Sequence, residues 1–352
     1  MHMADALISP LVGGAMWAAT AGLTAYGARK LKEKADDSMV PLMGVLGAFI
    51  FAVQMINFTI PGTGSSGHLG GGMILSILLG PYAAFLTMAS VLTVQALFFA
   101  DGGLLALGCN IFNLGFLPAY VVLPLVRRWI GVETGGARLA SGAMVGAVLS
   151  LQLGAFAVVL QTVASGVSAL PFGSFVLFML PIHLAIGIVE GLVTASVLGF
   201  VHRARPDVLP GVQGGSAAPV RGLLAAFGAA ALALGGFGAW YASGDPDGLE
   251  WSIARTSGQT EAQAPTSAIH HQLGRLQQAW ALMPDYAFAA KPASREAPPD
   301  EGPAPAAATT GSERLGTSVA GIVGALLTLA LALLVGGVLR LISRRQQATA
   351  RP

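Results

Sequence analysis

The residues with the clearest metal-binding chemistry are the first two, Met1 and His2, taken together with the distant His68. The α-amine of Met1, the amide nitrogen of His2 and the His2 imidazole lie within chelate-ring distance of one another. The His68 imidazole can supply a fourth nitrogen. Four nitrogens in a plane suit Ni(II) or Cu(II) better than Mg(II) or Ca(II). The alternative interpretation is that Met1-His2 only marks the start of translation and that His68 is a solvated loop histidine.

The amino terminus favours the metal-binding interpretation. No basic segment precedes the first apolar run, so the sequence predicts no cleavable signal peptide. His2 is a bulky second residue, and such residues generally protect the initiator methionine from removal. We therefore expect Met1 to keep its α-amine. Metal affinity should fall below about pH 6, because imidazole must be neutral to bind.

Membrane helices are the elements that have to position these nitrogens. The chain is 54% hydrophobic and 10% charged, against roughly 25% charged in ordinary soluble domains. Charged residues are absent from 38–100, 102–126 and 139–189. The sequence predicts an all-α polytopic membrane protein. The expected segments are 7–28, 40–58, 69–80 (short enough to be a half-helix), 82–100, 104–126, 139–165, 172–201, 221–242 and 317–340.

The distribution of basic residues predicts the orientation of these segments. An extracytoplasmic amino terminus and nine crossings put 14 of the 19 basic residues on the cytoplasmic side, together with the carboxyl terminus. The short outside loops at 59–68, 101–103 and 166–171 then contain no Lys or Arg. His2 and the glycine-rich loop that carries His68 are expected on the same outer side, in a cell inner membrane.

The chain is expected to divide near 206–220, where prolines and glycines indicate a cytoplasmic linker. A seven-segment core, 1–205, precedes it. A two-helix hairpin, 221–352, follows it and holds an extracytoplasmic segment at 243–316. We expect 290–311 to be disordered because it is rich in Pro, Ala and Glu.

Several polar residues interrupt the apolar segments and need partners inside the bundle. Asn110 and Asn113 share a helix face, and Asn113 is expected to make an interhelical hydrogen bond. Gln95 and Asn110 are candidates to orient His2 or His68. Asp101 is expected in an external turn. Cys109, the single cysteine, is expected to be a small buried side chain.

His183 and Glu190 lie seven residues apart on one helix face, and both are candidates for a metal pathway or a supporting role. The alternative is that neighbouring helices satisfy them to fix packing. Glu190 is expected nearer the cytoplasmic end, where it could bind a partner subunit. The pair His270-His271 is expected to be solvated rather than to capture metal.

Other functional classes find little support. No phosphate-binding loop of the ATPase type is present, and only four lysines exist. No nucleophile and base pair indicates an intramembrane enzyme. A self-sufficient channel or secondary transporter would need a charged path, for which only His183 and Glu190 are available. Neighbouring genes for an ATPase and a coupling membrane protein would separate that alternative from a transporter subunit.

Four stretches, in order along residues 1–205, resemble the CbiM/NikM family of substrate-capture (S) components of energy-coupling factor transporters. They are residues 1–10 (MHMADALISP), 67–72 (GHLGGG), 95–113 and 183–194. The stretch Pro246-Asp247-Gly248-Leu249-Glu250 resembles the PDGLE domain, a small N component often fused to this family.

The resemblance implies a non-catalytic subunit that binds Ni²⁺ or Co²⁺ as its transported substrate. Its metal ligands fall on Met1, His2 and His68. A transmembrane coupling (T) component and separate ATP-binding (A) components are the implied partners, with membrane lipid and no nucleic acid. The PDGLE fusion favours nickel over cobalt, and the N component is implied to help load or release the metal.

Overall fold

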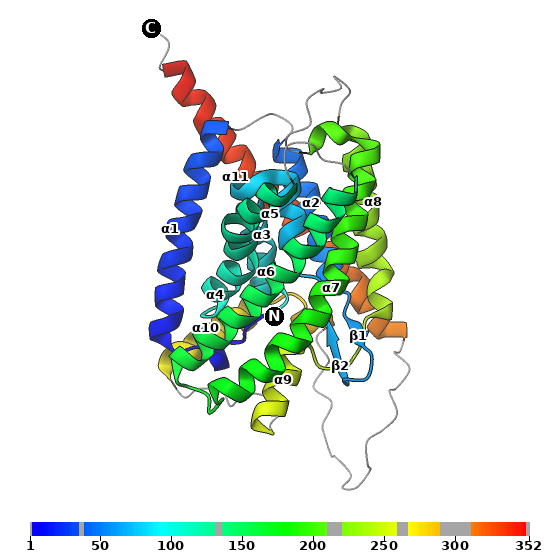
Figure 1. Cartoon of the computed structure of the whole chain (residues 1–352). Helices are drawn as coiled ribbons and strands as arrows, with labels where there is room; N and C mark the ends of the chain where they lie inside the picture. The colour runs from blue at the N-terminus through cyan, green and yellow to red at the C-terminus, as the bar shows by residue number, and fades with distance from the viewer. Residues whose placement is uncertain are drawn as a thin grey trace.

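The computed structural model describes residues 2–34, 39–130, 136–209, 220–258, 267–288 and 311–349. It is a bundle of long helices with one two-stranded hairpin (Figure 1). This confirms the all-α polytopic class. In the described ranges, five helices are long and apolar enough to cross a membrane: Gly72–Phe98, Leu107–Arg128, Gly136–Ser165, Phe172–Ala204 and Arg314–Arg345.

The described part of the first 209 residues forms seven α-helices, which surround His2 and His68. They are α1 (Pro10–Lys34), α2 (Met39–Gln54), α3 (Gly72–Phe98), α4 (Leu107–Ile111), α5 (Leu123–Ile130), α6 (Gly136–Ser165) and α7 (Phe172–Ala204). A π-helical stretch, Phe112–Val122, joins α4 to α5, and short 3₁₀ helices lie at Asp5–Leu7 and Pro206–Val208. The hairpin of β1 (Phe58–Ile60) and β2 (Ser65–Gly67) is antiparallel and pairs Phe58 with Gly67.

Helix α3 contains the two segments expected at 69–80 and 82–100. Gly80 breaks it with a φ of 75°, a conformation open to glycine, and Pro81 begins the second helical piece. The first piece, eight residues from Gly72 to Leu79, rises only about 12 Å. That is less than half of the roughly 30 Å hydrocarbon layer. The 69–80 segment is therefore a half-helix, which begins deep in the bundle.

The C-terminal part packs on the core through α8 (Arg221–Gly236) and α11 (Gly311–Thr349), which both contact α2. Small residues permit this close packing: a Cβ added at Gly44 would lie 2.8 Å from Leu333. Helix α8 ends six residues before the expected end of 221–242, and a 3₁₀ turn, Gly238–Tyr241, follows it. Between α8 and α11 in the sequence lie α9 (Gly248–Ser257), α10 (Ala268–Trp280) and a 3₁₀ turn at Pro284–Tyr286.

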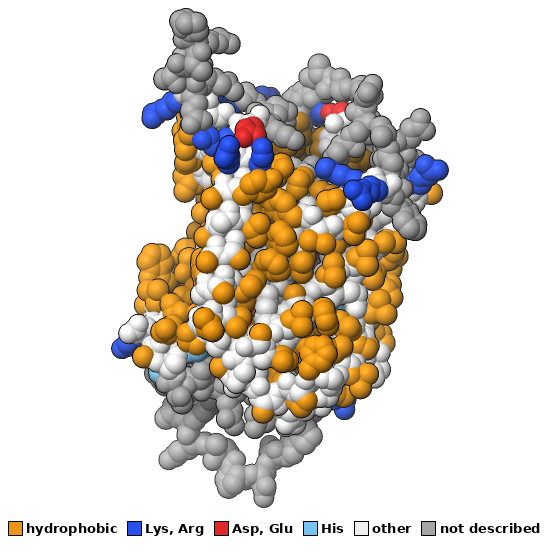
Figure 2. All heavy atoms as spheres, turned by 60° about the vertical axis from the view of Figure 1, so that its left-hand side comes forward, with side chains coloured by type: hydrophobic (Ala, Val, Ile, Leu, Met, Phe, Trp, Pro, Cys, Tyr) orange, Lys and Arg blue, Asp and Glu red, His pale blue; other side chains and the backbone are white. Residues whose placement is uncertain are grey.

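The surface separates into an apolar body and a basic end. Figure 2 shows hydrophobic side chains over the body, with most Lys and Arg gathered at one end. The end of α1 meets the end of α11 there, where the Ser343 hydroxyl donates to the carbonyl of Lys32 at 3.0 Å. His2 and His68 lie away from this basic end. The disorder expected at 290–311 falls almost entirely outside the described residues, as does most of the 206–220 linker.

Candidate metal site

The amino-terminal arm, residues 2–8, is inserted among the helices rather than lying on the surface. The Met3 amide donates to Asn110 Oδ1 at 2.8 Å, and Asn110 Nδ2 donates back to the Met3 carbonyl at 3.2 Å. The Gly103 amide donates to the same carbonyl at 2.9 Å. Met3 is fully buried. These bonds fix the backbone that follows His2, while Met1 itself lies outside the described residues.

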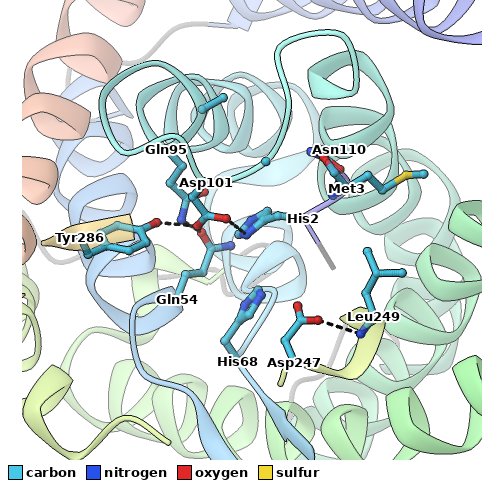
Figure 3. Close-up of polar contacts among 12 residues, drawn as sticks. His2, Met3, Gln54, His68, Gln95, Asp101, Asn110, Asp247, Leu249 and Tyr286 are labelled. Atoms are coloured by element: carbon cyan, nitrogen blue, oxygen red, sulfur yellow. Dashed lines mark hydrogen bonds and ion pairs between the residues drawn. The ribbon is translucent and has the colours of Figure 1, made fainter. Parts of the chain in front are cut away.

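The His2 and His68 rings meet face to face, with centroids 4.9 Å apart and planes 16° from parallel. His2 Nδ1 lies 3.0 Å from Asp101 Oδ1. His2 Nε2 is buried and has no hydrogen-bond partner among the described residues. Figure 3 shows the two rings next to each other, with Asp101 beside His2 on the side away from His68. The pairing of histidines 66 residues apart is thus a property of the fold.

His68 is placed by the chain that leaves β2. Gly71 has a φ of 73° and turns the chain into the half-helix of α3. The amides of Gly70 and Gly71 donate to the Glu190 carboxylate of α7 at 2.7 and 3.0 Å. On the other side, Gln54 Nε2 donates to the Gly70 carbonyl at 2.8 Å. The loop after His68 is therefore bound in place from two helices.

A segment from the C-terminal part lies along the His68 hairpin. The Ser66 amide donates to the Pro246 carbonyl at 2.8 Å, which adds a short parallel bridge to β2. Asp247 begins α9 as its N-cap, with Oδ1 accepting from the Leu249 and Glu250 amides at 2.8 and 2.9 Å. The Glu250 side chain bonds back to the Asp247 amide at 3.0 Å. This capping box holds the Asp247 carboxylate beside His68 (Figure 3).

The turn at Pro284–Tyr286, also from the C-terminal part, is connected to His2 through Asp101. The Tyr286 hydroxyl donates to Asp101 Oδ2 at 2.5 Å. The Tyr286 ring stacks on Phe99 with centroids 5.0 Å apart. The amides of Leu282 and Asp285 donate to main-chain carbonyls at the end of α3. Tyr286 and Asp101 thus form a hydrogen-bonded chain that ends on the His2 imidazole.

The electrostatics of the site favour a cation. Burial lowers the pKa of His68 to about 3, assisted by the positive charge of neighbouring groups that include His2. Its ring is therefore neutral and can bind metal. Burial alone would raise the pKa of Asp101, but the His2 ring and then the Tyr286 hydroxyl hold it well below the usual range. The positive charge of the nearby α-amine, and after it the hydrogen bond from the Glu250 amide, likewise lower the pKa of Asp247 against its burial.

Two cavities adjoin the histidines. A cavity of about 650 Å³ opens beside His2 and His68, and five carboxylates line it: Asp5, Asp101, Asp247, Glu250 and Asp285. A much smaller cavity of about 10 Å³, near the size of one water molecule, lies between His68, Asp247 and His183. Within the described ranges, no three His, Cys, Asp or Glu side chains converge at metal-binding distance. Metal binding by the two histidines therefore requires other donors, such as backbone nitrogens.

Of the predicted supporting residues, Asn110 and Gln95 are connected to the site, whereas Asn113 pairs with another helix. Asn110 holds Met3, next to His2. Gln95 Nε2 donates to Gln54 Oε1 at 2.9 Å, and Gln54 in turn holds the His68 loop. Asn113 exchanges two side-chain hydrogen bonds with Gln161 of α6, which is the interhelical role expected for it.

Glu190, His270 and Asp101 are placed differently from the expectations. Glu190 is only 1% exposed and bonds the His68 loop, so the expectation that it binds a partner subunit is wrong. His270 is buried, with Nε2 2.9 Å from the Ile8 carbonyl, whereas its neighbour His271 is exposed as expected. Asp101 lies in a turn, as expected, but its carboxylate faces inward to His2.

His183 is buried in α7, where Nδ1 lies 2.7 Å from the Met179 carbonyl. That bond assigns the proton to Nδ1, because a carbonyl accepts hydrogen bonds. Nε2 is buried without a hydrogen-bond partner among the described residues, and the ring lines the small cavity beside His68.

Asp247, Tyr286 and Gln54 were not predicted as site residues. The spacing of Asp247 and Glu250 is a capping-box signal, and it predicts the start of α9 but not which helix that start approaches. Gln54 is a polar residue at the end of an apolar segment, the same signal that identified Gln95. Tyr286 carries no local signal, because its role comes only from docking against the end of α3.

Two family models match the chain in succession. The model described as the cobalt uptake substrate-specific transmembrane region matches residues 2–208, and the PDGLE domain model matches residues 221–341.

Relatives of known name match one or both parts. A fused nickel transport protein, NikMN, of Rhodobacter capsulatus is 32% identical over 82% of this chain and 88% of its own length. A putative metal transport protein of Haloquadratum walsbyi is 37% identical over 59% of this chain and 93% of its own. A crystal structure of a transition metal transporter superimposes with a TM-score of 0.51 at 30% identity, covering 58% of this chain and 93% of that one.

Proposed function

Because the chain belongs to the family of cobalt-uptake substrate-specific transmembrane proteins, we propose that it captures a divalent transition-metal ion for uptake. The single observation that carries the proposal is the face-to-face meeting of His2 and His68 beside an acidic cavity. The two imidazole rings offer nitrogen ligands, and the carboxylates around them attract a cation.

We propose Met1, His2 and His68 as the metal ligands. The Met1 amine, the His2 amide nitrogen and His2 Nδ1 bind as one chelate, and a His68 ring nitrogen completes a plane of four. The His2 amide must lose its proton, and this favours late transition metals over Mg²⁺ or Ca²⁺. Asn110 supports the chelate by fixing the main chain of Met3.

The chelate requires a turn of the His2 ring. Only Nδ1 can close a six-membered ring with the amide nitrogen of the same residue, yet Nδ1 faces Asp101 at 3.0 Å. Rotation about the Cβ–Cγ bond moves Nδ1 to the opposite edge of the ring and brings Nε2 to the side of Asp101. Asp101 then accepts from Nε2–H and orients the bound ring.

Residues 1–205 form the metal-binding domain in this proposal, residues 206–220 a cytoplasmic linker, and residues 221–352 an N-component-like domain. The amino terminus faces outward and the basic end faces the cytoplasm. Metal therefore enters from the outside through the acidic cavity. A transmembrane coupling component and ATP-binding components of an energy-coupling factor transporter supply the energy, and this chain is not an enzyme.

His183 is the next nitrogen along an inward path. It lines the small cavity beside His68, and its Nε2 carries the lone pair because Nδ1 donates to Met179. An ion that leaves His68 toward the bundle interior would meet this nitrogen first. The variant His183→Leu should retain metal binding and lose uptake, measured with radioactive nickel in cells that also produce the partner subunits.

Nickel is proposed as the preferred ion over cobalt. The Rhodobacter capsulatus relative, which matches both parts of the chain, is named a nickel transport protein, whereas a relative from Geobacter sulfurreducens that matches the first part is named a cobalt transport protein. Metal analysis of the purified full chain, with Ni(II) and Co(II) in competition, tests this preference. Stronger retention of cobalt would reverse it and leave the site itself unchanged.

The decisive test of the site is a variant with four glycines added before Met1. The extension carries the α-amine away from the His2 chelate, so high-affinity Ni(II) and Co(II) binding should disappear while the fold remains. The matched control is a protein extended at its carboxyl terminus, which should bind normally. Normal binding by the amino-terminally extended protein would contradict the four-nitrogen site.

A further inference from the structure

Glu190 is the one carboxylate of α7, and it is buried in the middle of the bundle against the loop that carries His68. Its two oxygens accept from two consecutive backbone amides, Gly70 at 2.7 Å and Gly71 at 3.0 Å. An ionised carboxylate is an acceptor at both oxygens, and charged hydrogen bonds of this kind are the strong ones. The bonded peptides begin two residues after His68.

The local sequence is suited to this contact. A Cβ added at Gly70 would lie 3.2 Å from Glu190 Oε2, so a side chain there would crowd the carboxylate. Gly71 has positive φ, and a Cβ there would lie 2.7 Å from Ile50. The Gly70 and Gly71 amides lie at the start of the half-helix, where backbone donors have no partner within the helix. Glu190 provides that partner from another element.

The same peptide is held from the opposite side. Gln54 of α2 donates to the Gly70 carbonyl at 2.8 Å, and Gln95 of α3 donates to Gln54 Oε1 at 2.9 Å. The loop therefore lies between α7 and α2, with polar contacts to both. Removal of the Glu190 carboxylate would leave two buried amides without acceptors, which a short glycine-rich loop can relieve only by moving.

We propose that Glu190 is a positioning residue that holds the His68 ring in place to bind metal. This inference rests on the proposed function, because it assigns Glu190 a role in metal binding only through His68. Glu190 does not touch the ion. It fixes the peptide after His68 and so places the ring opposite His2.

A double-mutant cycle tests the proposal. Ni(II) affinity is measured for the full-length native chain, Glu190→Gln, His68→Ala and the double variant. Glu190→Gln should weaken binding about 10–100-fold, the range found for residues that orient a metal ligand. In the His68→Ala background the same substitution should have no further effect. Equal weakening in both backgrounds, or none in the native background, would overturn the proposal.

A matched control separates positioning from packing. Gln152 of α6 donates to the Leu180 carbonyl of α7 at 2.9 Å, and among the described residues it makes no hydrogen bond to the loop. Gln152→Leu should leave Ni(II) affinity unchanged. If Glu190→Gln fails to accumulate in the membrane, Gln54→Met removes the hold on the same peptide from the other side, with the same expectation in both backgrounds.

The cycle also distinguishes a failure of the proposed metal site from a failure of the positioning role of Glu190. If His68→Ala itself leaves Ni(II) affinity unchanged, the proposed metal site is wrong, whatever Glu190 does. If His68→Ala weakens binding and Glu190→Gln does not, the site stands and only the positioning role is wrong. The d–d absorption of bound Ni(II) should change in Glu190→Gln as the His68 nitrogen moves.

Discussion

His2 and His68 face each other across one space, but the chain holds them in different ways. His2 lies on an extended arm, and its ring is bonded by the Asp101 side chain. His68 follows the β1–β2 hairpin directly, and the hydrogen bonds that fix its loop go to the backbone after it. One ring is therefore set directly, and the other is set through the position of its loop.

The C-terminal part contacts the surroundings of both histidines. Pro246 bonds the hairpin of His68, and Tyr286 bonds the carboxylate that contacts His2. The arm can adjust by turning one ring, whereas the hairpin can adjust only by moving several residues. Of the two proposed ligands, His2 is therefore the adaptable one and His68 the fixed one.

The largest expected effect belongs to His2→Ala. It removes the imidazole end of the chelate and leaves only the five-membered ring of the α-amine and the amide nitrogen, so Ni(II) affinity should fall more than 100-fold, beyond the roughly 10–100-fold range of supporting residues. Isothermal titration of the purified protein measures it. His271→Ala is the matched control, because His271 is an exposed histidine at the rim of the same cavity. Equal effects of the two substitutions would refute the special position of His2.

His68→Ala should have the next largest effect. It removes a single donor and leaves the amino-terminal chelate intact, so a weaker three-nitrogen site should remain. Binding should fall about 100-fold, at the upper end of the effect expected for a supporting residue. Competition with a chelator of known affinity measures this difference. If His68→Ala proves more damaging than His2→Ala, the order of importance derived from the chelate is reversed.

Asp101→Asn should weaken Ni(II) binding about 10–100-fold, because the amide holds the His2 ring without a charge. Asp285→Asn is a suitable control, since Asp285 is another carboxylate of the same cavity. Titration of both variants at low and high salt separates the two contributions. General attraction of the cation is screened by salt, whereas orientation of the ring is not. Identical behaviour of the two variants would argue against an orienting role for Asp101.

Tyr286→Phe should have a smaller effect, about tenfold, the worth of one hydrogen bond to a charged group. The ring stays stacked on Phe99, so the docking of the segment should survive. In the Asp101→Asn background the substitution should have little additional effect, because the hydroxyl acts through that carboxylate. Full additivity of the two losses would show that Tyr286 acts by another route.

The smallest expected effect concerns pH. The pKa of His68 is lowered to about 3, so its ring is neutral from pH 5 to pH 8 and releases no proton when metal binds. His68→Ala should therefore reduce affinity by the same factor at pH 5 and at pH 8. The fall in affinity below about pH 6 then comes from the amino-terminal chelate. A factor that shrinks at pH 5 would mean that His68 titrates in this range.

The helical class and most segments follow from the sequence, since long charge-free stretches admit few other structures. Gly80-Pro81 also indicates the break in α3. The depth of the half-helix does not follow, because it depends on Glu190, whose partners lie 119 and 120 residues away. Local patterns cannot predict contacts of that kind.

The candidate site shows the same division. His2 and His68 are identifiable because their residue types restrict the chemistry, and topology puts them on one side. Asp101 follows a span like any turn residue, and its inward carboxylate is visible only once the arm is in place. Asp247 is predictable as a helix cap, but its second role, beside His68, requires α9 to pack against α7.

The order of assembly follows from where the site residues lie in the chain. Asn110 fixes the arm, Glu190 fixes the hairpin, and Tyr286 reaches Asp101. During synthesis from the amino terminus, Asn110 is the 108th residue added after His2. Until then, the backbone of Met3 has no Asn110 side chain to bond it. The site is complete only after the last of these groups, Tyr286, has been made. A nascent chain therefore exposes its two histidines before the residues that surround them exist.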